Sequence, residues 1–107
     1  MRYTSSVSGE LWWPAAQADH IRTRSERYAG AVAIEPGWTS EAAVDPHRIV
    51  RDPDPVSRNG AVRIIGFSSS AGFVLTVIVD PADGAGITAW KTSGADLHAY
   101  EGGRRER

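Results

Sequence analysis

The stretch FVLTVIV (Phe73–Val79) decides the fold, because it is the most strongly predicted strand in the chain. Side chains of a strand alternate between its two faces. One face would carry Phe73, Leu75, Val77 and Val79, and the other Val74, Thr76 and Ile78. Both faces are largely apolar, so we expect residues 73–79 to lie inside a sheet rather than at its edge.

Turn signals on both sides of this strand predict its neighbours. The segment SSSAG (68–72) precedes it and PADG (81–84) follows it. Further upstream, the loop at 52–60 contains two prolines and an Asn-Gly pair. The predicted strands are residues 47–51, 61–67, 73–79 and 86–92. Because short turns join consecutive strands, we expect an antiparallel meander.

Helix signals lie toward the two ends of the chain. A first helix would run from Pro14 to about Tyr28 and end at Gly30. After a turn at Pro36-Gly37, a short helix over 41–44 would be capped by Thr39 or Ser40 and stopped by Asp45-Pro46. A last helix would open at Ser93, with Asp96 completing a capping box, and end near Glu101 before Gly102-Gly103. The fold class is α+β, and we expect these helices to cover one sheet face and leave the other partly open.

Composition limits the classes of function. The chain has 107 residues, a net charge of -1, one lysine among 12 Lys and Arg, and no cysteine. Its length predicts a single domain, 1–107, with frayed tails at 1–10 and 102–107. The absence of cysteine excludes disulfide scaffolds, zinc-thiolate sites and thiol nucleophiles. No apolar run approaches the length of a membrane span, so we expect a cytoplasmic protein.

Several segments together resemble one protein family. They are Trp13-Pro14, the helix segment Trp38–Ala42 before Asp45-Pro46, Ile65–Ser68, Phe73–Val79, Gly86–Lys91 and Tyr100-Glu101. Their order and spacing are similar to those of the BrnT-type ribonuclease toxins. The resemblance implies a RelE-like fold, RNA cleavage without a metal or other cofactor, and a cognate antitoxin as partner. The chain departs from the family in having few basic residues across the last strand and the last helix.

Metal-free RNA cleavage needs a base, an acid and cations, because the 2′-OH attacks the neighbouring phosphate. The candidate catalytic residues are Lys91, His98, Arg63 and Tyr100. Lys91 ends the fourth strand and would steady the phosphate, and His98, one turn into the last helix, would move a proton. Arg63 alternates into a strand face, and Tyr100 could contact a phosphate or a base. Each of the four also has a structural interpretation without a catalytic role. In the same order, they would be an edge-strand lysine, a surface histidine, a solvated arginine and a core tyrosine.

Further arginines are candidates for RNA contact. Arg48 shares parity with Val50 and could lie on the same open face as Arg63, while Arg22 and Arg24 lie on the first helix. A solvated helix face explains Arg22 and Arg24 equally well. We expect Trp90 in the core. The three histidines and the acidic residues show no metal-ligand spacing.

Two functions from different classes remain. The first is the toxin component of a toxin–antitoxin pair. The second is a non-catalytic protein-interaction module on the same fold, which the slightly acidic net charge favours. Direct DNA binding is weaker, because no recognition-helix signature is present. A homo-oligomer and a toxin–antitoxin hetero-oligomer are both compatible with the sequence.

Overall fold

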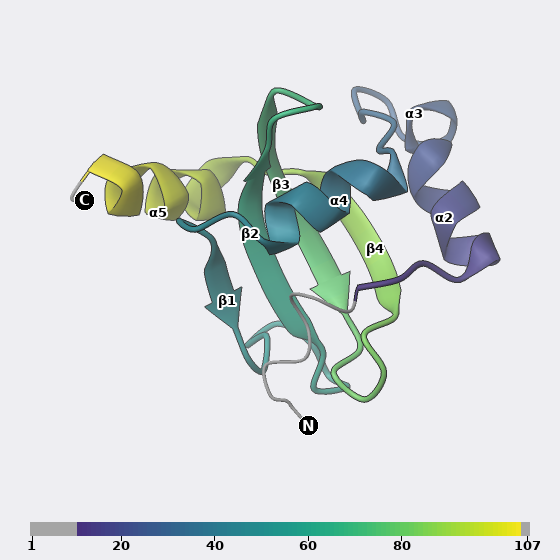
Figure 1. The fold of residues 1–107 in the computed structure, drawn as a ribbon. Helices are drawn as coiled ribbons and strands as arrows, with labels where there is room; N and C mark the ends of the chain where they lie inside the picture. The colour runs from purple at the N-terminus through teal and green to yellow at the C-terminus, as the bar shows by residue number, and fades with distance from the viewer. Residues whose placement is uncertain (1–10, 106–107) are drawn as a thin grey trace.

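The computed structural model describes residues 11–105 and contains the predicted four-stranded sheet (Figure 1). The strands are β1 (Ile49–Arg51), β2 (Val62–Ser68), β3 (Phe73–Val79) and β4 (Gly86–Lys91). They lie in the order β1-β2-β3-β4, and each pairs antiparallel with the next. The α+β class and the meander are therefore confirmed, and β3 is an inner strand as its two apolar faces predicted.

Two N-terminal helices cover one face of the sheet, where the larger core lies. These are α2 (Ala15–Arg22) and α4 (Pro36–Ala43). The buried core contains Ile21, Ile34, Ala42, Ala43, Val62, Ile64, Leu75, Val77, Val79 and Ala89. Gly66 allows the closest approach, since a Cβ there would lie 2.1 Å from the backbone oxygen of Ala42. A glycine at this position thus lets α4 rest directly on β2.

The N-terminal helices differ from the sequence prediction in their bounds. The expected continuous helix breaks at Thr23, whose hydroxyl donates to the Asp19 carbonyl (2.7 Å), and a short helix α3 (Arg24–Arg27) follows. The expected turn at Pro36-Gly37 is wrong, because Pro36 occupies the first turn of α4. Thr39 is not a cap either: it lies inside α4 and accepts a hydrogen bond from Trp13 Nε1 (2.7 Å).

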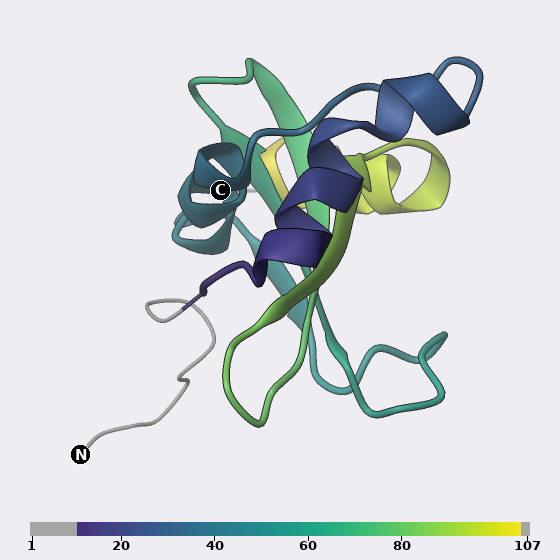
Figure 2. The same ribbon diagram turned by 90° about the vertical axis from the view of Figure 1, so that its right-hand side faces the viewer.

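The last helix, α5 (Gly94–Arg105), packs on the opposite face of the sheet. There Tyr100 and Leu97 meet Ile65, Val74 and other apolar side chains in a second, smaller cluster. The view in Figure 2 shows α4 and α5 on either side of the sheet. The expectation that all helices cover one face is therefore wrong. The helix also continues through Gly102 and Gly103, where we expected it to end.

Of the tails expected to be frayed, 1–10 and 102–107, residues 1–10 and 106–107 lie outside the described residues, whereas 102–105 belong to α5. Among residues 11–105, none of the helices is long and apolar enough to cross a membrane.

Candidate functional site

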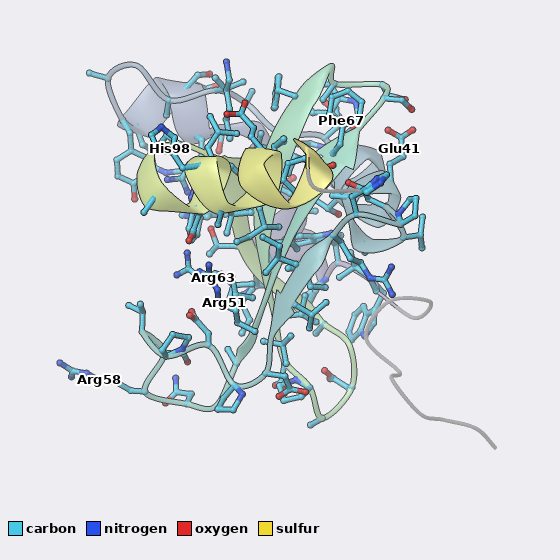
Figure 3. The ribbon with its side chains drawn as sticks, turned by 90° about the vertical axis from the view of Figure 1, so that its left-hand side faces the viewer. Glu41, Arg51, Arg58, Arg63, Phe67 and His98 are labelled. Atoms are coloured by element: carbon cyan, nitrogen blue, oxygen red, sulfur yellow. The ribbon has the colours of Figure 1, made fainter. Side chains whose placement is uncertain are left out.

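The sheet face on which α5 packs carries a cluster of four charged side chains beyond the helix, and Figure 3 shows two of them, Arg51 and Arg63. Arg51 and Arg63 are directly opposite each other on β1 and β2. The Asp96 carboxylate, from the first turn of α5, accepts from Arg51 Nη1 (2.6 Å) through one oxygen and from Arg63 Nη1 (2.7 Å) through the other. Asp54 completes this group, which we call the Arg–Asp cluster.

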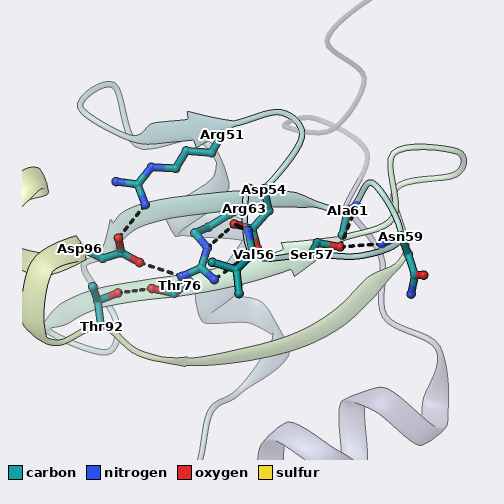
Figure 4. A network of polar contacts seen from close by, with 10 residues as sticks. All are labelled: Arg51, Asp54, Val56, Ser57, Asn59, Ala61, Arg63, Thr76, Thr92 and Asp96. Atoms are coloured by element: carbon teal, nitrogen blue, oxygen red, sulfur yellow. Dashed lines mark hydrogen bonds and ion pairs between the residues drawn. The ribbon is translucent and has the colours of Figure 1, made fainter.

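Asp54 holds the remaining donors of Arg63 (Figure 4). Its two oxygens accept from Nε (3.1 Å) and Nη2 (3.2 Å) of Arg63. The Arg63 side chain is 13% exposed and that of Asp54 only 4%. On β4, the ring of Trp90 lies 5.4 Å from the Arg63 guanidinium carbon. Trp90 is thus half-buried beneath an arginine, whereas the sequence placed it in the core.

The ion pairs shift two pKa values in the cluster. Partial burial acts to raise the pKa of Asp96, but hydrogen bonds from Arg51 and Arg63 outweigh it and hold that pKa below its ordinary value. Burial likewise acts to lower the pKa of Arg63, and its bonds to Asp54 and Asp96 raise it overall. The cluster therefore holds two positive and two negative charges, and its net charge is zero.

Tyr100, a candidate catalytic residue, is a core residue with 2% exposure. Its hydroxyl donates to Asp45 at the end of α4, and Asp45 also accepts from the backbone N–H groups of Phe67 (2.8 Å) and His47 (2.9 Å). Burial acts to raise the pKa of Asp45, but these bonds outweigh it and lower that pKa. Tyr100 therefore anchors α5 to the sheet and to the end of α4.

A second carboxylate, Glu41 of α4, fixes the turn between β2 and β3. It accepts from Ser68 Oγ (2.7 Å), Ser70 N (2.9 Å) and Ser70 Oγ (2.6 Å). These bonds, that from Ser68 first, lower the pKa of Glu41 to about 2. Glu41 thus stays ionised well into acid.

The placement of Arg48 beside Arg63 is wrong. Val50 is opposite Ile64, so the parity that Arg48 shares with Val50 belongs to the face covered by α4. Arg48 lies before β1 and donates to the Asp45 carbonyl (3.1 Å). The arginine that does share the face of Arg63 is Arg51, which the sequence analysis missed. Local sequence does not identify it, because Arg51 and Arg63 lie on opposite sides of the loop at 52–60. Only the strand register across that loop shows that they are partners.

Lys91 and His98 are both exposed, as expected of residues that meet a substrate. Lys91 is opposite Leu75 on the face that α2 and α4 cover, and its ammonium lies 5.0 Å from the centroid of the Phe73 ring. His98 projects from the outer side of α5 (Figure 3), the helix on the other face. The two residues thus come from elements on different faces of the sheet. Both stand near the same end of it, because only residues 92–93 separate β4 from α5, and Lys91 also lines a smaller hollow with Leu97 and Glu101 of that helix.

Lys91 shares a surface hollow of about 600 Å³ with Arg24, another candidate for RNA contact. The hollow lies between the segment after α3 and the link from β4 to α5. It is lined by Arg24, Ala29, Gly30, Ala31, Val32, Trp90, Lys91, Thr92 and Ser93. No acidic residue is among these, and we call this site the cationic hollow.

The two cations of the hollow are held without carboxylates. Arg24 Nη1 donates to Thr88 Oγ1 (3.5 Å), and its guanidinium carbon lies 5.0 Å from the centroid of the Tyr28 ring. Below the hollow, a hydrogen bond between the buried hydroxyls of Thr76 and Thr92 (2.8 Å) fixes the link into α5. Arg22, by contrast, lies outside the lining and pairs with Glu35 (3.4 Å).

Within residues 11–105, no group of three or more His, Cys, Asp or Glu side chains is placed to hold a metal ion. No protein-family model, curated protein or solved structure matches the chain.

Proposed function

We propose that the protein is the toxin component of a toxin–antitoxin pair and that it cleaves RNA without a metal. One observation carries the proposal: Arg24 of α3 and Lys91 of β4 line a single hollow that has no acidic lining residue. The order of the elements, with three helices, then four antiparallel strands and then a C-terminal helix in residues 11–105, is compatible with the resemblance to BrnT-type toxins.

The hollow suits a phosphate backbone. A guanidinium can contact two phosphate oxygens at once, and an ammonium adds a compact point charge. The link from Ser93 into α5 brings the N-terminus of a 12-residue helix to the rim, where backbone N–H groups also favour an anion. Lys91 would steady the phosphate that receives the 2′-OH attack, and Arg24 a neighbouring one.

His98 is the proposed proton carrier. Of the four candidate catalytic residues, Arg63 is bound to two carboxylates and the Tyr100 hydroxyl to Asp45, so both serve the fold in this state. His98 is exposed on α5 and accessible to a bound strand. In this proposal the base or acid acts from α5, while the cations act from the hollow at the start of that helix.

The second candidate is a non-catalytic interaction module. It is favoured by the hydrogen bonds that Arg63 and Tyr100 make to carboxylates within the fold. Under it, the cationic hollow would bind an acidic segment of a protein partner, and no acid or base would be needed. In the first proposal the cognate antitoxin is a partner in addition to the RNA. In the second proposal it would be one of the protein partners that bind the hollow.

The test compares matched cation variants in growth and in cleavage of a labelled single-stranded RNA. Expression of the parent should arrest growth, and the purified protein should cut the RNA with EDTA present. Lys91→Ala and Arg24→Ala should each lower the rate on the order of 10²–10³-fold. Arg22→Ala removes an equal charge outside the hollow and should retain activity.

Circular dichroism of each variant controls for folding. His98→Ala should reduce cleavage on the order of 10²–10⁴-fold and leave RNA affinity nearly unchanged, since His98 does not line the hollow. A parent that neither arrests growth nor cuts RNA would transfer the assignment to the interaction module. Equal activity of all variants and the parent would contradict the site.

A further inference from the structure

Arg51 and Arg63 form a pair that ordinary sheet packing does not explain. They are cross-strand partners at the end of β1, so their side chains leave the same face side by side. Like charges directly opposite each other destabilise an antiparallel pair. Two arginines in this arrangement therefore need an anion between them.

In the described structure that anion is Asp96, which comes from a different element. Each carboxylate oxygen binds one arginine, at 2.6 Å and 2.7 Å. A phosphate group also presents two or more oxygens, and arginine binds both carboxylates and phosphates through charge-assisted hydrogen bonds. The carboxylate thus occupies a position that also suits a phosphate.

Arg63, one half of the arginine fork, would keep its orientation without Asp96. Asp54 binds Nε and Nη2 of Arg63 and leaves Nη1 directed at Asp96 (Figure 4). Departure of Asp96 would leave this orientation in place, so the Arg63 half of the site is built in advance and Arg51, 33% exposed, would close on the ligand. Trp90 beneath the guanidinium supports the same position.

Asp96 can leave while α5 stays docked. The helix has a separate anchor, the hydrogen bond from Tyr100 to Asp45, and Leu97 packs in the same apolar cluster. The side chains of Asp96 and Arg51 are 20% and 33% exposed, so solvent reaches the contact. Only the first turn of α5 would need to move.

We infer that the Arg51–Arg63 pair is a phosphate-binding site, and that Asp96 occupies it in the absence of ligand as an autoinhibitory contact. A phosphate group displaces Asp96 and takes its place between the two guanidinium groups. That this phosphate belongs to an RNA backbone rests on the proposed function, whereas the binding of a phosphate group does not. The second face of the sheet then becomes cationic only when Asp96 leaves the two arginines.

The test measures binding of inorganic pyrophosphate and of a single-stranded RNA to Asp96→Asn. This variant removes the competing charge and keeps the side-chain shape. We expect both ligands to bind roughly tenfold more tightly than to the parent, because the site is no longer blocked for most of the time. Asp52→Asn, an equal charge change at an exposed position of the adjoining loop, should bind as the parent does.

A second variant and a second readout keep the test decisive. Adding Arg51→Gln to Asp96→Asn should abolish the gain, and it leaves the Arg63–Asp54 pair intact. In the unaltered protein, pyrophosphate should shift the backbone amide NMR signals of residues 94–97, whereas sodium chloride at equal ionic strength should not. Unchanged affinity in folded Asp96→Asn, or unmoved 94–97 signals if that variant does not fold, overturns the inference.

Tighter pyrophosphate binding without RNA cleavage would support this site and contradict the proposed function. Cleavage of RNA by the parent, together with unchanged ligand affinity in Asp96→Asn, would support the proposed function and contradict this site. The two failures are therefore distinguishable.

Discussion

The Arg–Asp cluster and the cationic hollow are built from similar cations but differ in their partners. Arg63 and Arg51 meet two carboxylates, whereas Arg24 and Lys91 meet hydroxyl and aromatic groups. Trp90 contributes to both, since its ring lies beneath Arg63 and it also lines the hollow. The comparison teaches that two arginines in one small protein take opposite roles according to whether a carboxylate from another segment reaches them.

The Arg–Asp cluster and the cationic hollow should also differ in how much they contribute to stability. A partly buried ion pair contributes little relative to an apolar replacement, but the loss of one partner leaves an uncompensated buried charge. An exposed cation without a carboxylate contributes almost nothing to stability and remains available to a ligand. Stability should therefore depend on the cluster, and ligand binding in the resting state on the hollow.

The largest expected effect comes from Arg63→Met. It removes all three hydrogen bonds to Asp54 and Asp96. The carboxylate of Asp54, which is 4% exposed, would lose its cationic partner. We expect the free energy of unfolding to fall by about 3–5 kcal/mol, measured by urea denaturation. Arg24→Met is the matched control and should stay within about 0.5 kcal/mol of the parent. Equal losses in the two variants would remove the distinction between the regions.

A smaller loss is expected for Tyr100→Phe, which tests the other anchor of α5. The ring would still fill its place in the core, but Asp45 would lose its side-chain donor and keep two backbone N–H groups. The free energy of unfolding should fall by about 1–2 kcal/mol in urea denaturation. Tyr28→Phe, at an exposed tyrosine, is the control and should be neutral. No loss in Tyr100→Phe would mean that Asp96 and the apolar contacts hold α5 by themselves.

The sequence predicted the strands because their signal is local. Alternation and turn residues gave the bounds of β3 and placed β1, β2 and β4 within two residues. The Arg–Asp cluster could not be predicted in the same way, since it depends on the register across the loop at 52–60 and on the face that α5 takes. Parity alone led to Arg48 rather than Arg51, and Asp96 was assigned to a helix cap.

The hollow was predicted in part. Lys91 and Arg24 were both candidates, on different grounds, but nothing local indicated that they would meet. Their meeting depends on the break at Thr23, where a hydroxyl bonded to the Asp19 carbonyl ends α2 and redirects the chain. A continuous helix to Tyr28, as predicted, would have carried the later residues elsewhere. Side-chain competition for a backbone carbonyl is difficult to rank from sequence.

Acid should weaken the carboxylate contacts. The folded-state pKa values of Asp96 and Asp45 are lowered, and that of Glu41 falls from 4.5 to about 2. Such groups contribute stability that is complete above their unfolded pKa values and is lost as pH falls through the folded ones. The urea midpoint should therefore be level above about pH 5 and decline toward pH 2. Glu41→Gln should make the decline shallower, and an unchanged decline would contradict the role of Glu41.

The smallest change in stability, and the sharpest contrast with Arg63, is expected for Arg24→Gln. This variant removes one hollow cation whose contacts are a long hydrogen bond to Thr88 and the Tyr28 ring, so the urea midpoint should not move. If Arg24 neutralises one phosphate, the slope of log affinity for single-stranded RNA against log salt should decrease in magnitude by about 0.7. Arg22→Gln, which breaks only exposed ion pairs to Glu35 and Asp19, should leave the slope unchanged. Equal slopes in all three proteins would mean that RNA does not reach the hollow, and the Arg51–Arg63 fork would then be the remaining phosphate contact.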